Sequence, residues 1–308
     1  MICALLKWFL RSFLFLAFLA SFLVFFFSFK GYSHYFQSVR GAHTNIDIQQ
    51  YASDAHTKKF LLRINTVNGF CVNAGLLAPN DSSRKYPAII LLGGKATGKY
   101  AINYALGIDN VIILALDYPY EPRESYTVWT IMSDVLSVRK AIFDMVPSAI
   151  LGVDYLFSRR DVDTTKLIVL GYSFGAPFVP VIVAHDRRAA IAVMVYGGGE
   201  LTSLIRHNVA RYESFWLSEF VGRLGGLLLH PLEPMKYADK ISPTHLLMIN
   251  GENDEQIPRY NTESFFNASK EPKKLIWLKS LHVHPDNVDL TRRIIATLNT
   301  ELKGMKIL

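Results

Sequence analysis

The sequence predicts an α/β fold: a doubly wound, mostly parallel sheet of about eight strands, preceded by a transmembrane helix. Two patterns lead to this prediction. After residue 56, short apolar runs of strand length alternate with helix-like stretches, as in sheets that carry helices on both faces. Residues 12–29 form an uncharged run of 18 residues, which reaches the length of a membrane-spanning helix.

The N-terminal run predicts an uncleaved membrane anchor over residues 1–30. The run is longer than the apolar region of a signal peptide, and no clear cleavage site follows it, although a cleaved signal peptide is the alternative. Lys7 and Arg11 precede the run and favour a single-pass topology with a cytoplasmic N-terminus. The main domain would then lie outside, in the periplasm if the source is bacterial.

Residues 31–56 are polar and mixed, and predict a linker into one domain over residues 57–308. The apolar runs are rich in Ile, Leu and Val, which is typical of parallel strands buried on both faces. The first two, joined by residues 66–69, predict an antiparallel hairpin at the sheet edge. Strands are predicted at residues 60–65, 70–77, 88–92, 111–116, 167–170, 190–195, 246–249 and 275–278.

Helical stretches are predicted between these strands, at residues 99–106, 128–157, 176–185, 260–268 and 289–302. One interval, residues 200–242, has no strand and contains Trp216 and Phe220. It predicts a helical insertion over the strand ends, where such sheets bind their ligands.

The strongest motif is Gly171-Tyr172-Ser173-Phe174-Gly175, which fits GxSxG and follows the buried strand LIVL. A sharp strand-to-helix turn requires glycines at both flanks and presents the serine hydroxyl at the carboxyl end of the sheet. The alternative is an ordinary glycine-rich turn with a capping serine. The context favours a nucleophilic Ser173.

A serine nucleophile needs a base, and the base needs an acid that orients it. Asp254 follows one predicted strand, with Glu252 as an alternative acid, and His282 and His284 follow the last strand. The order serine, acid, histidine is that of α/β-hydrolases.

In these motifs the chain resembles the α/β-hydrolase superfamily, near its esterase and dienelactone-hydrolase-like members, over most of residues 57–303. The resemblance implies an α/β-hydrolase fold with Ser173 as nucleophile and Asp254 as acid. It favours His282 as the base and leaves His284 open, because Leu281 stands where the family usually has glycine.

An oxyanion hole is expected from backbone N–H groups. One donor would be Phe174, and the other Lys95 or Gly94, in a loop where the family often has His-Gly and this chain has Gly-Gly.

Two motifs suggest other chemistry. Residues 93–100 fit the phosphate-binding pattern GxxxxGK, but Tyr100 stands where Mg²⁺ binding needs serine or threonine. The histidine pair resembles the start of the HxHxDH motif of metallo-β-lactamase-like hydrolases, but Asn287 replaces its last histidine and no second histidine cluster offers ligands. We therefore expect neither a metal nor another cofactor.

These observations predict a serine hydrolase that cleaves carboxylic esters or thioesters of a small acyl substrate through an acyl-enzyme. The alternatives are an acyltransferase or peptidase with the same triad, and a non-catalytic membrane-tethered binding protein. The net charge of +7 is spread without a Lys/Arg run, so no nucleic-acid partner is expected. Cys3 and Cys71 lie on opposite sides of the apolar run and predict no disulfide; the oligomeric state stays open.

Overall fold

The computed structural model describes residues 2–94, 97–104, 107–108, 110–120 and 128–308. The chain divides into two compact units. The main unit comprises Ser33–Glu200 and Leu232–Leu308, and the helical unit comprises Met1–Tyr32 and Leu201–Pro231.

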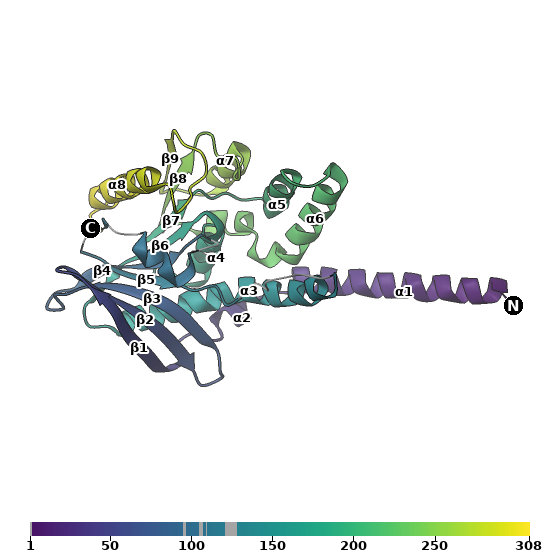
Figure 1. Cartoon of the computed structure of the whole chain (residues 1–308), viewed down its shortest axis with the longest axis horizontal. Coiled ribbons are helices and arrows are strands. Elements are labelled where there is room, and N and C mark those ends of the chain that lie inside the picture. The colour runs from purple at the N-terminus through teal and green to yellow at the C-terminus, as the bar shows by residue number, and fades with distance from the viewer. Residues whose placement is uncertain (1, 95–96, 105–106, 109, 121–127) are drawn as a thin grey trace. The chain divides into compact units, whose positions relative to one another are not determined.

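The main unit is built on a nine-stranded sheet with the order β1-β2-β3-β5-β4-β6-β7-β8-β9 (Figure 1). The six strands from β5 to β9 in this order pair in parallel, whereas β1, β2, β3 and β5 pair antiparallel. The sheet is thus mostly parallel, as predicted. The strands are β1 His43–Ser53, β2 Thr57–Thr66, β3 Cys71–Pro79, β4 Tyr86–Leu92, β5 Ile112–Leu116, β6 Val162–Tyr172, β7 Ile191–Val195, β8 His245–Gly251 and β9 Lys273–Leu278.

All eight predicted strands are present, but the prediction of a linker over residues 31–56 is wrong for most of its length. This segment forms helix α2, Ser33–Gln37, and the edge strand β1. Strand β1 is exposed at nearly every position, so its composition is polar and lacks the apolar run that marks a buried strand. The β2–β3 hairpin is antiparallel as predicted but lies one strand inside the edge.

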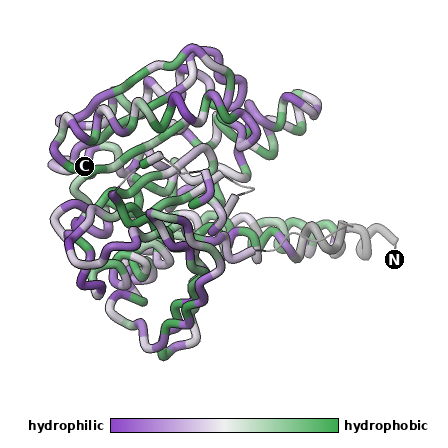
Figure 2. Tube along the Cα trace, turned by 60° about the vertical axis from the view of Figure 1, so that its left-hand side comes forward, coloured by the Kyte–Doolittle hydropathy of each residue, from purple (hydrophilic) through white to green (hydrophobic). Residues whose placement is uncertain are grey.

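Helices cover both faces of the sheet, and alternate residues of β4 point to opposite layers, because side chains alternate along a strand. Ile89 and Leu91 belong to one core cluster with residues of α8. Ile90 points to the other face, where a Cβ on Gly152 of α3 would lie 3.2 Å from it. Figure 2 shows the hydrophobic colouring of these inner strands. The helices are α3 Val128–Ser158, α4 Phe178–His185, α7 Arg259–Ala268 and α8 Val288–Gly304, with the 3-10 helix η1 at Gly98–Asn103.

The helical unit contains α1, Ile2–Phe29, and the pair α5, Leu201–Ala210, and α6, Phe215–Leu228. The predicted insertion is therefore helical, but its last part, with the 3-10 helices η4 Pro234–Lys236 and η5 Ala238–Lys240, belongs to the main unit. Among the described residues, the one helix long and apolar enough to cross a membrane is Asp134–Ser158, and 78% of its apolar 18-residue window is buried inside the protein. The transmembrane helix predicted at residues 12–29 stays a prediction.

Candidate active site

Ser173 lies where β6 ends and the chain turns sharply into the short 3-10 helix Ser173–Gly175, followed by α4. Its backbone has a φ of 49°, in the left-handed region that L-residues rarely adopt. Strain of this kind persists only where the surroundings impose it, and it is common at functional positions. The turn places the Ser173 side chain at the carboxyl end of the central parallel strands.

The two glycines of the motif allow this turn to pack tightly. A Cβ on Gly171 would lie 2.5 Å from the carbonyl oxygen of Gly175, and a Cβ on Gly175 would lie 2.2 Å from the carbonyl oxygen of Leu92. Both distances are too short for any side chain, and the obstructing atoms are backbone. At both positions, backbone atoms therefore leave no room for a side chain.

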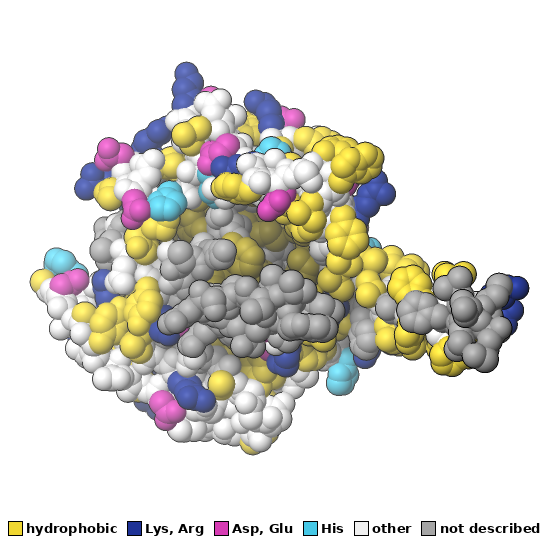
Figure 3. All heavy atoms as spheres, turned by 45° about the vertical axis from the view of Figure 1, so that its right-hand side comes forward, with side chains coloured by type: hydrophobic (Ala, Val, Ile, Leu, Met, Phe, Trp, Pro, Cys, Tyr) yellow, Lys and Arg dark blue, Asp and Glu magenta, His cyan; other side chains and the backbone are white. Residues whose placement is uncertain are grey.

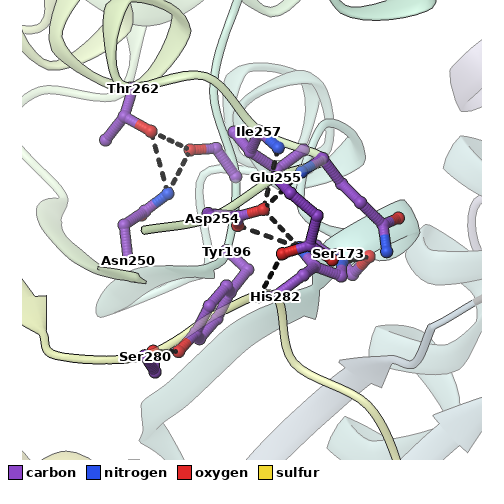
Figure 4. A network of polar contacts seen from close by, with 11 residues as sticks. Ser173, Tyr196, Asn250, Asp254, Glu255, Ile257, Thr262, Ser280 and His282 are labelled. Atoms are coloured by element: carbon purple, nitrogen blue, oxygen red, sulfur yellow. Dashed lines mark hydrogen bonds and ion pairs between the residues drawn. The ribbon is translucent and has the colours of Figure 1, made fainter. Parts of the chain in front are cut away.

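A continuous line of hydrogen bonds joins Ser173, His282 and Asp254 (Figure 4). The Oγ of Ser173 lies 2.7 Å from Nε2 of His282. The Nδ1 of the same ring lies 2.9 Å from both carboxylate oxygens of Asp254. The side chains of His282 and Asp254 are only 5% and 1% exposed, so water has little access to this line.

The loop after β8 fixes the Asp254 carboxylate. The backbone N–H groups of Gln256 and Ile257 donate to its Oδ1 over 2.8 and 2.9 Å. Glu252, the alternative acid, is exposed on the same loop. The structure therefore brings Asp254, and not Glu252, to the histidine.

The two histidines after β9 lie in different surroundings. His284 has a side chain that is 70% exposed, and its Nδ1 lies 3.2 Å from a carboxylate oxygen of Asp286. His282 is buried between Ser173 and Asp254. The geometry thus separates two candidates that the sequence left open.

Two further side chains, which no sequence motif marks, support His282. The carboxylate of Glu255 accepts a hydrogen bond of 3.0 Å from the His282 backbone N–H. Burial raises the pKa of Glu255, but the backbone N–H groups of His282 and of Glu255 itself outweigh it and leave this pKa below its usual value. The ring of Tyr196 meets the imidazole edge-on with centroids 5.5 Å apart. The position of Glu255 directly after Asp254 was the signal available in the sequence.

Tyr196 is itself held firmly. It is fully buried, its backbone has a φ of 55°, and its hydroxyl hydrogen-bonds the Ser280 hydroxyl. A Cβ on Gly251 would lie 2.8 Å from its ring. Burial raises the pKa of the Tyr196 hydroxyl, although its bond to Ser280 opposes this, so the group stays protonated and acts as a neutral hydrogen-bonding partner.

The loop expected to supply an oxyanion donor follows β4. Lys95 lies outside the described residues, whereas Gly94 is described and lines the same pocket as Ser173. The carbonyl of Gly94 accepts hydrogen bonds from the N–H and the hydroxyl of Thr97, both 3.0 Å long. The hydroxyl of Tyr118 donates to the Gly93 carbonyl. Burial raises the pKa of Tyr118, so it remains a donor.

Phe174, the other expected oxyanion residue, directly follows Ser173 in the first turn after β6. Its ring packs edge-on against Tyr118, with centroids 5.2 Å apart, and against Phe178, 5.8 Å apart. These aromatic contacts hold the peptide that carries its N–H.

A pocket of about 210 Å³ opens beside Ser173 and His282. Its other walls are mostly apolar and reach the core beneath the Gly93-Gly94 loop. They comprise Leu91, Ala101, Tyr104, Ile108, Leu170, Tyr172, Val283, Pro285 and Thr291, with Gly93, Gly94, Thr97, Gln256 and His284 at the polar side. A small apolar group bound here would lie next to the serine hydroxyl.

The alternative motifs take other roles. Lys99, the lysine of the phosphate-binding pattern, pairs with Asp117 at 2.6 Å and lies in a 3-10 turn rather than at the start of an α-helix. In the described part of the chain, no three His, Cys, Asp or Glu side chains gather as a metal site.

Comparison with known proteins agrees with this architecture. Residues 144–287 match the prolyl oligopeptidase family. The uncharacterized protein YfhR of Escherichia coli K12 is 30% identical over 126 residues, 41% of this chain and 40% of YfhR; its counterpart in Escherichia coli O157:H7 is 26% identical over 125 residues. The match thus spans about two fifths of the length of these relatives.

Solved esterase structures have the same fold. Acetyl xylan esterase 1 from Thermoanaerobacterium sp. JW/SL YS485 has a TM-score of 0.63 at 16% identity, over 87% of this chain and 92% of the esterase. The Pyrococcus furiosus esterase Pf2001 has a TM-score of 0.58 at 18% identity, over 84% and 91%. The chain has the α/β-hydrolase fold of these esterase-like proteins.

Proposed function

We propose that this protein is a serine hydrolase that cleaves carboxylic ester or thioester bonds through an acyl-enzyme. The observation that carries the proposal is the line of hydrogen bonds from Ser173 through His282 to Asp254, which starts at a strained turn and borders an apolar pocket. A serine hydroxyl is a weak nucleophile and becomes reactive when an oriented base takes its proton. The three side chains supply a nucleophile, a base and an acid in the required order.

The mechanism follows from the tautomer that Asp254 selects. Nδ1–H of His282 donates to the carboxylate, so Nε2 is free to accept the Ser173 proton. As Nε2 takes that proton, Oγ bonds to the acyl carbon, and the protonated imidazole then gives the proton to the departing alcohol or thiol. A water molecule, deprotonated by the same nitrogen, attacks the acyl-enzyme; its hydroxyl remains with the acid product and Oγ regains a proton.

Charge that develops on the carbonyl oxygen needs N–H donors at fixed positions. The Phe174 N–H is the first proposed donor, because this residue directly follows the nucleophile. Lys95 or Gly94 would supply the second from the loop after β4. The hydroxyls of Thr97 and Tyr118 bind the carbonyls of Gly94 and Gly93, which turns those carbonyls toward the protein.

The pocket favours a short acyl group. Its volume of about 210 Å³ corresponds to roughly seven water molecules at ~30 Å³ each, enough for an acyl chain of about two to six carbons. Two of the similar structures are named acetyl xylan esterases, which agrees with this size. Activity toward p-nitrophenyl esters should fall once the acyl chain exceeds hexanoate; an optimum at dodecanoate contradicts the assignment of this pocket to the acyl group.

Peptide cleavage or acyl transfer with the same triad is the second candidate, and the match of residues 144–287 to the prolyl oligopeptidase family favours it. A panel of esters, thioesters and prolyl peptides at equal concentration separates the two. A higher kcat/KM for peptides than for short esters would show that the protein is a peptidase rather than an ester hydrolase.

The direct test compares Ser173→Ala with the wild type. The variant should lose fluorophosphonate labelling and p-nitrophenyl acetate turnover together, with an unchanged melting temperature. His282→Gln should cause a similar loss, whereas His284→Gln, which changes an exposed residue at the pocket rim, should lose far less activity than His282→Gln. Failure of the folded wild type to react with fluorophosphonate would instead indicate a binding protein on a hydrolase scaffold.

The proposed enzyme is held at a membrane by α1. Many large side chains along this helix are at least half exposed, among them Phe13, Phe15, Phe18, Phe22, Phe25 and Phe26, and its composition suits lipid. Lys7 and Arg11 favour a cytoplasmic N-terminus with the main unit outside, in the periplasm if the source is bacterial. Protection of the main unit from added protease in inverted vesicles of matching membranes, and its digestion in right-side-out vesicles, checks this orientation.

A further inference from the structure

Helix α6 exposes its large apolar side chains rather than burying them. Five residues of the helix share this property: Phe215 is 66% exposed, Trp216 81%, Leu217 42%, Phe220 63% and Leu224 36%. Trp216, Phe220 and Leu224 are four residues apart, so they form one stripe along the helix. An apolar stripe on an outer helix face indicates contact with an apolar partner.

The face of α6 that is buried carries small residues. Ser218 is 1% exposed, and Gly222 and Gly226 follow it at intervals of four. A Cβ on Gly222 would lie 2.7 Å from the Arg206 Cβ of α5, and one on Gly226 would lie 1.9 Å from the Thr202 hydroxyl.

The two helices therefore approach closely through small residues while the aromatic residues point away. A helix that only covers a core has the opposite arrangement.

The exposed stripe belongs to the same compact unit as α1. Past the end of α6, the ring of His230 packs on Phe29 of α1 with centroids 4.4 Å apart, and its Nδ1 lies 3.3 Å from the Ser28 carbonyl oxygen. Phe29 is the last residue of α1, and Lys30 follows it. If α1 spans a membrane, this end lies at the outer lipid–water interface, and the C-terminal end of α6 lies near it. Figure 3 shows hydrophobic side chains, in yellow, on α1.

The charge of this unit fits an anionic lipid surface. Residues 1–32 and 201–231 contain six Lys and Arg residues but two Glu residues. Arg223, on α6 itself, has a side chain that is 78% exposed. Basic side chains beside an apolar stripe are typical of helices that lie in the headgroup region.

We propose that α6 lies in the plane of an anionic bilayer, with Trp216, Phe220 and Leu224 inserted among the lipid headgroups and first acyl carbons. Tryptophan and phenylalanine suit this depth because their rings are apolar yet tolerate the polar interface. The α5–α6 pair is then a second membrane contact, distinct from a spanning α1. This proposal concerns attachment and does not depend on the hydrolase chemistry.

The test uses the full chain with Cys3→Ser and Cys71→Ser, reconstituted in vesicles of phosphatidylcholine with about 30% phosphatidylglycerol, a composition that supplies anionic headgroups. An environment-sensitive fluorophore is attached at Phe220→Cys or, as the matched control, at Val67→Cys. Val67 is 80% exposed at the β2–β3 turn of the main unit. The probe at 220 should be quenched by nitroxide-labelled lipid and shielded from iodide, whereas the probe at 67 should show the reverse.

Two results overturn the proposal. Equal iodide quenching at positions 220 and 67 would show that α6 faces water. Shielding from iodide at 220 without quenching by nitroxide lipid would show that protein, from this chain or another copy, covers the helix.

A second variant tests the stripe itself. With the probe at Leu224→Cys, the double change Trp216→Ser/Phe220→Ser should reduce nitroxide quenching by about threefold or more, because it removes most of the inserted area. Esterase activity on a soluble substrate and the melting temperature report separately on the fold and on the proposed function. Undiminished quenching in the folded double variant contradicts insertion through this stripe.

Discussion

Replacing Asp254 with Asn tests the proposed mechanism at the carboxylate that orients the His282 ring. Both carboxylate oxygens of Asp254 lie 2.9 Å from Nδ1 of His282, but only Oδ1 also accepts two backbone N–H groups, from Gln256 and Ile257. In Asp254→Asn the amide oxygen would keep the two backbone donors, which leaves the NH₂ group against Nδ1. That group donates, so the imidazole proton moves to Nε2, where it blocks transfer from Ser173.

The expected loss in kcat follows from the distance between Nδ1 of His282 and the Asp254 carboxylate. An imidazolium and a carboxylate 2.9 Å apart attract by about 6 kcal/mol at an effective dielectric constant of ~20. This attraction stabilises the charged histidine in the transition state, and its loss at ~1.4 kcal/mol per factor of ten corresponds to about a 10⁴-fold lower kcat. The same change in serine proteases has a loss of about this order. The two side chains are nearly inaccessible to water, so solvent does little to screen the pair.

The assay is initial-rate hydrolysis of p-nitrophenyl acetate, with the folded fraction measured by thermal unfolding. Glu252→Gln is the matched control, because Glu252 is an exposed acid on the same loop, and it should change kcat by less than about twofold. If folded Asp254→Asn keeps more than about a tenth of the wild-type kcat, or if Glu252→Gln causes the larger loss, the assignment of the acid is wrong.

Three further predictions concern the fold that holds this site. Gly175→Ala should lower the free energy of unfolding in urea by about 3 kcal/mol or more, because its Cβ would lie 2.2 Å from the Leu92 carbonyl oxygen; a fully stable variant contradicts the packing of the turn. Gly94→Ala should leave the melting temperature unchanged, because no atom lies within 4 Å of the added Cβ. A change in kcat of this variant would then reflect the proposed role of the loop in binding the oxyanion. Burial lowers the pKa of His185 from its ordinary 6.5, so the unfolded chain binds this proton more readily and stability falls as pH drops below about 6.5. His185→Gln should flatten the fall of the melting temperature between about pH 7 and 5.

The central strands could be predicted from sequence because burial on both faces forces continuous apolar runs. Strand β1 could not, since its one neighbour in the sheet is β2 and nearly all of its side chains face water. Its sequence HTNIDIQQYAS is ordinary for an exposed edge, where polar residues also discourage pairing with other chains. Residues 43–53 form a strand because they pair with β2, and their own composition does not indicate this.

The sharp turn at Ser173 was predictable for the opposite reason, because its geometry is local. Ser173, its positive φ and the glycines at 171 and 175 lie within five residues, so one short motif contains every requirement of the turn. Tyr118 and Tyr196 follow the distant strands β5 and β7, and they support the site through a carbonyl of the loop after β4 and through a ring contact with His282. Neither tyrosine lies in a motif, and only the assembled sheet brings them there.

The choice between His282 and His284 shows where local reasoning ends. Two residues apart, both would point the same way in a regular strand, and β9 has already ended at Leu278. What distinguishes them is the loop after β8, which offers the Glu255 carboxylate to the His282 backbone N–H and the Asp254 carboxylate to its ring. These partners lie 27 and 28 residues away in the chain, and they reach His282 because β8 and β9 pair in parallel and end side by side. The register of that pair, rather than any feature of residues 279–284, decides which imidazole meets Ser173.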